Sequence, residues 1–202
     1  MRALRGLVLV AVALAAPLAA QASGKVERVE LRERGAFAEW QYVDDAGTQT
    51  FVNVIVSESA REPGTGNAPG PALAVSVFSV DADGFVVFSG TGVTETFDFT
   101  SSNGLNGAHA AGTVIVADEG QGTSESFNVD VTWEPAGVTT PTHGHSHFRE
   151  DGFISHFQFS GLQRPSNADG TVFGKGVEWA PIPATAALML RNTAGSVTII
   201  VE

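Results

Sequence analysis

The sequence predicts an all-β protein, an antiparallel β-sandwich or jelly roll of about ten to twelve short strands. Three observations support this class. Val, Thr and Phe recur with a period of two after residue 35, which is typical of strands with one buried face. Gly, Asp and Asn interrupt these runs at short intervals, and the 23 glycines suit a fold with many tight turns. Helical periodicity is missing from the same part of the sequence.

The strands should follow one another mainly as hairpins. In chain order we expect strands at residues 36–43, 48–57, 73–80, 85–89, 93–100, 113–117, 124–133, 143–150, 153–159, 170–179, 185–191 and 196–201, the last two forming a closing hairpin. Residues 184–189 have an alternative as one helical turn, because Ala, Leu and Met favour helix. Residues 61–71 and 101–112 are expected loops, and the second of them holds His109.

Two turns have similar sequences, Asp44-Asp45-Ala46-Gly47 and Asp81-Ala82-Asp83-Gly84. The second also resembles the opening of an EF-hand calcium loop. That motif needs a ligand at its fifth position and a Glu at its twelfth, and this chain has Phe85 and Gly92 there. We therefore expect a hairpin turn at this place.

The first 22 residues have the organisation of a cleavable export signal. Arg2 and Arg5 form a short positive region, which is followed by an uninterrupted apolar segment, Leu7–Ala16. The segment Ala20–Ala22 places small residues at the spacing for cleavage near Ala22, so residues 23–202 should form the mature protein. The apolar segment is too short to span a bilayer. The sequence thus predicts a secreted or periplasmic single domain that does not insert into a membrane.

Charge and cysteine content limit the partners of this protein. The chain has 11 basic and 22 acidic residues and a formal net charge of −11, so its surface should repel nucleic acid. The same surface would tolerate cations, including divalent ones. The chain has no cysteine, so the exported protein must be stabilised by its core without disulfides.

Four of the five histidines lie in residues 142–160, THGHSHFREDGFISHFQFS. Asp151-Gly152 is a preferred two-residue hairpin turn, because both residues tolerate the positive φ of a type I′ turn. With this turn His147 faces His156, whereas a four-residue loop would place His145 opposite His156. Side chains alternate between the two faces of a strand, so the histidines share one face in either register. The other face should carry an aromatic set that fills the core: Phe148, Phe153, Phe157 and Phe159.

The histidine face is the strongest candidate for a functional site. Histidines two residues apart in a strand point the same way, about 6.6 Å apart along the axis, and a cross-strand neighbour lies about 5 Å away. This spacing suits a site for Zn²⁺ or another divalent transition metal formed by His145, His147 and His156. His143 and Glu150 are further candidate ligands, although Glu150 belongs to the opposite face. The alternative is an exposed histidine cluster that binds nothing specific or pairs with nearby carboxylates.

The same segment resembles the first motif of the cupins through Gly137, His143, His145 and Glu150. This resemblance would imply a metal-dependent enzyme that uses the histidine cluster. Phe157 stands where the closing glycine of the motif belongs, and the second cupin motif is absent.

A wider set of residues resembles a group of uncharacterised secreted bacterial β-rich proteins. The similar segments are 129–133 (VDVTW), 145–148 (HSHF), 152–154 (GFI), 164–165 (RP) and 170–172 (GTV). No activity is known for this group, so the resemblance implies no function. It centres on His145, His147 and Phe148.

These observations favour a secreted non-catalytic protein, a surface, matrix or binding module, with a histidine-based site for a divalent metal. The chain lacks GxSxG and HExxH motifs, which supports a non-catalytic role. A first alternative is the cupin-like metal enzyme, with His145, His147 and His156 as ligands and Glu150 or Arg149 assisting. A second alternative is a carbohydrate-binding module with a glycan or cell-surface partner. Its sugar platform would use four aromatic residues: Trp40, Tyr42, Trp133 and Trp179.

Overall fold

The computed structural model describes residues 26–61, 70–102, 104–120, 122–150, 153–179 and 185–199. The expected export signal, most of the 61–71 loop and the predicted Asp151-Gly152 turn lie outside these ranges. Within the ranges, no helix is long and apolar enough to cross a membrane.

In the residues that the structure describes, eleven antiparallel strands form one hydrogen-bonded sheet, which confirms the predicted all-β antiparallel class and the predicted number of strands. The strands are β1 (Val26–Val43), β2 (Gln49–Arg61), β3 (Ala72–Val80), β4 (Val86–Thr94), β5 (Phe97–Ser101), β6 (Ala108–Asp118), β7 (Ser124–Pro135), β8 (Thr140–Glu150), β9 (Phe153–Gly174), β10 (Val177–Trp179) and β11 (Thr185–Ile199).

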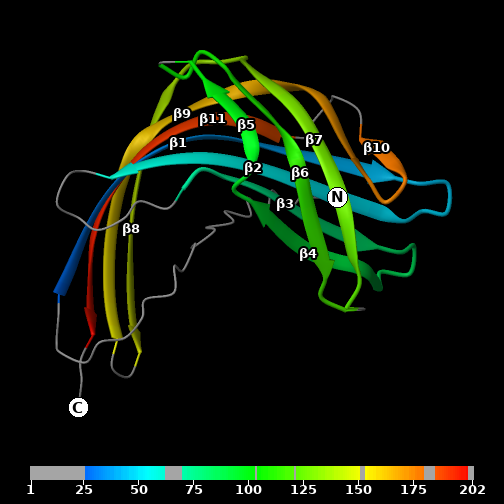
Figure 1. The fold of residues 1–202 in the computed structure, drawn as a ribbon, viewed down its shortest axis with the longest axis horizontal. Helices are drawn as coiled ribbons and strands as arrows, with labels where there is room; N and C mark the ends of the chain where they lie inside the picture. The colour runs from blue at the N-terminus through cyan, green and yellow to red at the C-terminus, as the bar shows by residue number, and fades with distance from the viewer. Residues whose placement is uncertain are drawn as a thin grey trace, which may run out of the picture.

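The strand pairing closes on itself, so the sheet surrounds its core (Figure 1). Hydrogen-bonded neighbours follow in the order β1, β2, β3, β4, β6, β7, β9, β11 and back to β1. β9 completes this circuit, because residues 166–173 pair with β7 while residues 153–165 pair with β11. β5 pairs with β6, and both β8 and β10 pair with β9, outside the circuit.

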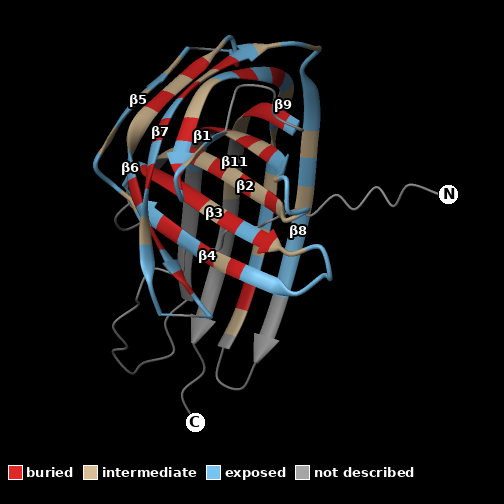
Figure 2. Cartoon of the chain, turned by 90° about the vertical axis from the view of Figure 1, so that its right-hand side faces the viewer, coloured by how far each residue is buried: buried red, intermediate tan, exposed pale blue. Residues whose placement is uncertain are grey.

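Alternation along the strands places one set of side chains inside the circuit. In β2, Val52, Val54 and Val56 are fully buried, while the residues between them are only partly buried. Figure 2 shows this alternation as bands of colour along β2 and β3. Because β-branched residues pack well on a pleated surface, these valines both favour the strand and fill the core.

Two tryptophans are the largest side chains of this core. Trp40 is 2% exposed and Trp133 is fully buried. The indole Nε1 of Trp133 donates a hydrogen bond to the carbonyl oxygen of Phe37, at 2.9 Å. β7 and β1 are not neighbours in the sheet, so this bond links two separate parts of the core wall.

Four strands continue past the closed circuit and form an open extension, visible at the lower left of Figure 1, where β8 runs alongside β9, β11 and β1. The extension consists of residues 26–34, 189–199, 153–163 and 140–150, which pair in the order β1, β11, β9, β8. Strand structure was expected only after residue 35. The charged segment 26–34 is nevertheless a strand, because β11 pairs with it along its whole length and β2 pairs with it from Leu31 onward.

The two Asp-x-x-Gly turns have the same hydrogen bonds. The carboxylate Oδ1 of Asp44 accepts from the backbone N–H groups of Ala46 and Thr48, at 2.9 and 2.8 Å. Oδ1 of Asp81 accepts from the N–H groups of Asp83 and Phe85, at 3.0 and 2.8 Å. Each turn ends in a glycine with positive φ, 82° at Gly47 and 86° at Gly84. The expected hairpin turn at 81–84 is therefore confirmed.

Several expectations for individual elements were wrong. Residues 93–100 and 170–179 were each expected to form one strand, but β4 ends at Thr94 before β5 begins at Phe97, and a turn at residues 175–176 separates β9 from β10. Residues 153–174 form one strand where a break was expected between 160 and 170, because β7 and β11 pair with successive parts of it. Residues 185–199 form one strand where a hairpin was expected, and the helical alternative for 184–189 fails over 185–189. His109 lies in β6 and not in a loop, and its Nε2 is 3.0 Å from Oδ1 of Asp130.

Candidate functional site

The β8–β9 pairing has the register expected for a two-residue turn. His147 pairs with His156, and Glu150 pairs with Phe153 where the paired residues end. His145 pairs with Gln158, so the register of the four-residue loop does not occur. The sequence thus predicted the pairing correctly, although residues 151 and 152 themselves are outside the described ranges.

The structure brings two histidine rings together. The ring centroids of His147 and His156 are 6.2 Å apart, and both side chains are exposed. His145 and His143 lie two and four residues before His147 on the same strand and are also exposed. The structure describes the side chains of these four histidines but not that of Glu150. In the part of the chain that it describes, no group of three or more His, Cys, Asp or Glu side chains is arranged to hold a metal ion.

Phe157 and Phe159 do not fill the core, contrary to the expectation, and the side chains of Phe148 and Phe153 lie outside the described set. Leu188 of β11 belongs to the core. Ser196 lies eight residues further along β11, an even number, so the two positions are on the same face of the strand. Ser196 pairs with His156 in an uninterrupted register. Alternation therefore places His156 on the side of the sheet that faces the core, and Phe157 and Phe159 on the back. Both rings are half-buried there, and a Cβ added at Gly144 would overlap the ring of Phe159. The histidines are exposed because the extension continues past the end of the core.

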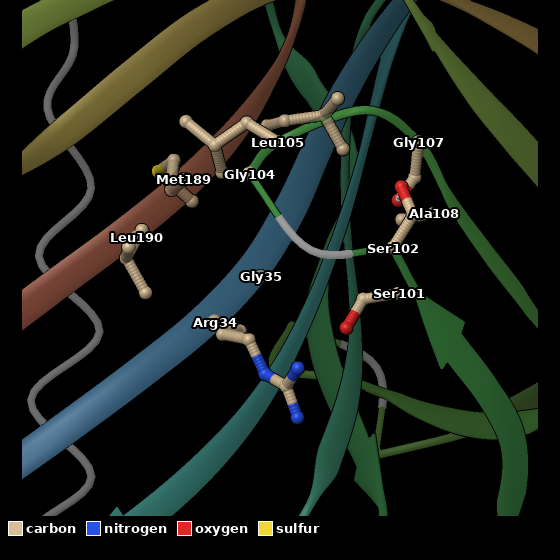
Figure 3. A pocket seen from close by; sticks show the side chains of 11 residues that line it. Arg34, Gly35, Ser101, Ser102, Gly104, Leu105, Gly107, Ala108, Met189 and Leu190 are labelled. Atoms are coloured by element: carbon tan, nitrogen blue, oxygen red, sulfur yellow. Dashed lines mark hydrogen bonds between the residues drawn. The ribbon is translucent and has the colours of Figure 1, made fainter.

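A cavity that the sequence did not predict lies where the extension joins the closed circuit. It has a volume of about 150 Å³ and lies between β1, β11 and the β5–β6 loop, residues 102–107 (Figure 3). Its lining residues are Arg34, Gly35, Ser101, Ser102, Gly104, Leu105, Gly107, Ala108, Leu188, Met189 and Leu190. The sequence signal that could have indicated it is Leu105, one apolar residue in a polar, glycine-rich loop.

The β5–β6 loop is held in place by Arg164 of β9. The guanidinium donates from Nη1 to Oδ1 of Asn106, at 3.0 Å, and from Nε to the carbonyl oxygen of Gly137, at 2.8 Å. Leu105 then lies at the end of the core with 8% of its surface exposed. The loop thereby covers one end of the core and forms one wall of the cavity.

The expected sugar platform does not form from the residues that the structure describes. Trp40 and Trp133 are buried in the core and do not reach the surface. Tyr42 is 41% exposed, and the side chain of Trp179 is outside the described set. No observation therefore supports an aromatic platform for a glycan.

Comparisons with known proteins do not identify a family. No family model and no curated protein matches this chain. Among solved structures, an acetoacetate decarboxylase-like enzyme from Sphingomonas wittichii RW1 is similar with a TM-score of 0.32 and 9% identity, covering 87% of this chain and 93% of that chain. A putative AttH from Nitrosomonas europaea is similar with a TM-score of 0.21 and 12% identity, covering 87% of this chain and 52% of that chain. Similarities this low do not establish a shared fold.

Proposed function

We propose that this chain is an exported, non-catalytic binding protein that holds a divalent transition-metal ion such as Zn²⁺ on the face of His145, His147 and His156. The observation that carries the proposal is the cross-strand pair. His147 lies opposite His156 with the ring centroids 6.2 Å apart.

The spacing of this pair suits one ion between two imidazoles. A zinc–nitrogen bond is about 2.0–2.1 Å long, so two such bonds extend over at most about 4 Å between the nitrogens. In the tetrahedral geometry of zinc sites the two ring centroids would lie about 5 Å apart, about 1 Å closer than the observed 6.2 Å, so a small change of rotamer would bring both nitrogens onto one ion. Both side chains are exposed, so their rotamers can adjust around an ion. His145 is two residues from His147 on the same face and supplies a third imidazole.

The net charge of the whole chain favours a cation. The chain has a formal net charge of −11, which attracts positive ions to its surface. In the described part of the chain, no ion pair or hydrogen bond occupies the rings of these three histidines, whereas the ring of His109 is engaged by Asp130. Metal binding would therefore not have to displace a carboxylate from these rings.

The exposure of the site supports binding over catalysis. Catalytic sites are usually concave and exclude water, which strengthens the electrostatic interactions inside them. His143, His145, His147 and His156 are all exposed on an open strand face. An ion there would complete its coordination with water and would not be enclosed with a substrate.

The proposal is tested by isothermal titration of residues 23–202 with ZnCl₂ and, separately, NiCl₂. We expect one ion per chain with a micromolar dissociation constant, and at least about tenfold weaker binding in the H147A and H156A variants. H109A is the matched control, because His109 lies on β6 and is paired with Asp130. Zinc binding of wild-type strength in both H147A and H156A would contradict the proposal, and so would the absence of binding to the unaltered protein. Zinc-dependent hydrolysis of a test ester would instead favour the enzyme alternative.

A further inference from the structure

The cavity beneath the β5–β6 loop differs from the histidine face in both position and chemistry. Its walls include the buried residues Leu105, Ala108 and Leu188, which are 8%, 7% and 2% exposed. An apolar cavity of about this size, 150 Å³, is large enough for a benzene ring. None of the four histidines of β8 and β9 lines it.

The backbone of the β5–β6 loop is strained where it forms the cavity wall. Leu105 has a φ of 60°, a left-handed conformation that is uncommon for a residue with a side chain of this size. The backbone N–H of Ser102 donates to the carbonyl oxygen of Gly107 at 2.9 Å, and Arg164 holds Asn106. Strained residues persist only where their surroundings hold them, and they are frequent at ligand sites. The loop is thus a preformed wall.

Arg34 is the charged residue among those that line the cavity (Figure 3). Its Nη2 donates to Oε2 of Glu58 at 2.8 Å, and both side chains are nearly half exposed. A guanidinium has five N–H donors and binds carboxylates through two parallel hydrogen bonds. Arg34 therefore has donors for a second carboxylate beyond the one it shares with Glu58.

We propose that this cavity binds a small monocarboxylate with an aromatic or branched aliphatic body of about six to eight non-hydrogen atoms. The body contacts Leu105, Leu188 and Leu190, and the carboxylate binds the guanidinium of Arg34. Glu58 shares this guanidinium, and its negative charge repels the ligand carboxylate and lowers the affinity of the ligand. The site shares no residue with the histidine face, so carboxylate binding and metal binding can be tested independently.

Benzoate and its uncharged counterpart benzyl alcohol serve as probes, with binding to residues 23–202 followed by NMR chemical shifts. We expect benzoate to bind at least about tenfold more tightly than benzyl alcohol, because only benzoate pairs with Arg34. R34Q should abolish this preference, and E58Q should increase the affinity for benzoate several-fold. R32Q removes a nearby exposed arginine that does not line the cavity, and it should leave both affinities unchanged.

The A108V variant tests the cavity itself, since two added methyl groups would occupy part of its volume. A108V should weaken the binding of both probes, and its melting temperature should show that the protein still folds. Equal affinities for benzoate and benzyl alcohol would overturn the role of Arg34. An unchanged or weaker affinity for benzoate in E58Q would overturn the repulsion by Glu58. If neither benzoate nor benzyl alcohol changes the chemical shifts of the β5–β6 loop, the proposed site is overturned.

Discussion

Trp133 of β7 is hydrogen-bonded to Phe37 of β1 through its indole nitrogen, at 2.9 Å, although the two strands are not adjacent in the sheet. The indole is fully buried, so the bond lies inside the core. We expect W133F to lower the free energy of unfolding by about 1–3 kcal/mol, because it removes this bond and part of the buried ring. Urea denaturation followed by circular dichroism measures the change. Y42F alters a more exposed aromatic residue and should change the free energy of unfolding by less than about 0.5 kcal/mol. An equal loss of unfolding free energy in W133F and Y42F would contradict a stabilising role of the Trp133 hydrogen bond.

The junction of β4 and β6 requires glycine. A Cβ added at Gly92 would overlap the carbonyl oxygen of Ile115, and one at Gly90 would overlap that of Ala117. We therefore expect G92A to destabilise the protein by about 1–3 kcal/mol or to prevent folding, because the backbones of β4 and β6 would have to separate. Gly70 is the matched control, because nothing lies within 4 Å of a Cβ added there and its φ is not in the left-handed region. A melting temperature of G92A equal to that of G70A would show that the junction can relax.

Replacing Arg164 should destabilise the β5–β6 loop more than the core. R164M keeps most of the aliphatic length but removes the hydrogen bonds to Asn106 and Gly137. Hydrogen bonds from a charged group contribute about 1.5–3 kcal/mol, so we expect a loss of stability in this range. Faster amide hydrogen exchange in residues 102–107 should accompany it. In R32M, which alters an exposed arginine of β1, exchange in the loop should stay as in the unaltered protein. Slow exchange in the loop of R164M would mean that Arg164 does not anchor it.

Metal binding should also appear as thermal stabilisation. A ligand that binds only the folded state stabilises it by about 2.7 kcal/mol at a concentration one hundred times its dissociation constant. The melting temperature of residues 23–202 should therefore rise with zinc, and the rise should disappear with EDTA. H147A and H156A should show little increase, while H109A should respond like the unaltered protein. A zinc response that persists in both H147A and H156A would place the ion elsewhere.

The export signal gives the most direct prediction from sequence. Expressed in full, the protein should be recovered outside the cytoplasm with Ser23 as its first residue, because Ala20 and Ala22 satisfy the requirement for small residues before the cleavage site. Mass spectrometry of the exported chain measures this. Replacing Ala22 with Phe should block cleavage and leave the leader attached. Recovery of the uncleaved protein in the cytoplasm would contradict the prediction.

Short-range patterns explain where the sequence analysis succeeded. The Asp44 and Asp81 turns depend on a carboxylate that accepts bonds from N–H groups two and four residues later, so all the interacting groups lie within five consecutive residues. The pairing of His147 with His156 depends on a turn between two nearby strands. In each case the interacting residues are close in sequence.

The sequence analysis failed where the partner strand is distant in the chain. The polar residues 160–169 do not show a strand pattern, yet they are strand because β7 and β11 pair with them. The cavity was missed for the same reason, since its walls come from β1, the β5–β6 loop and β11.

The sequence by itself determined the β class, the turns and the sharing of one face by the histidines, because period-two alternation and turn chemistry act between neighbouring residues. Only the tertiary structure decided which face of β9 lies on the same side of the sheet as the core. That outcome depends on Ser196 of β11 pairing with His156, and on Leu188 of β11 belonging to the core. Alternation assigns side chains to two faces but does not say which of them another part of the chain will cover.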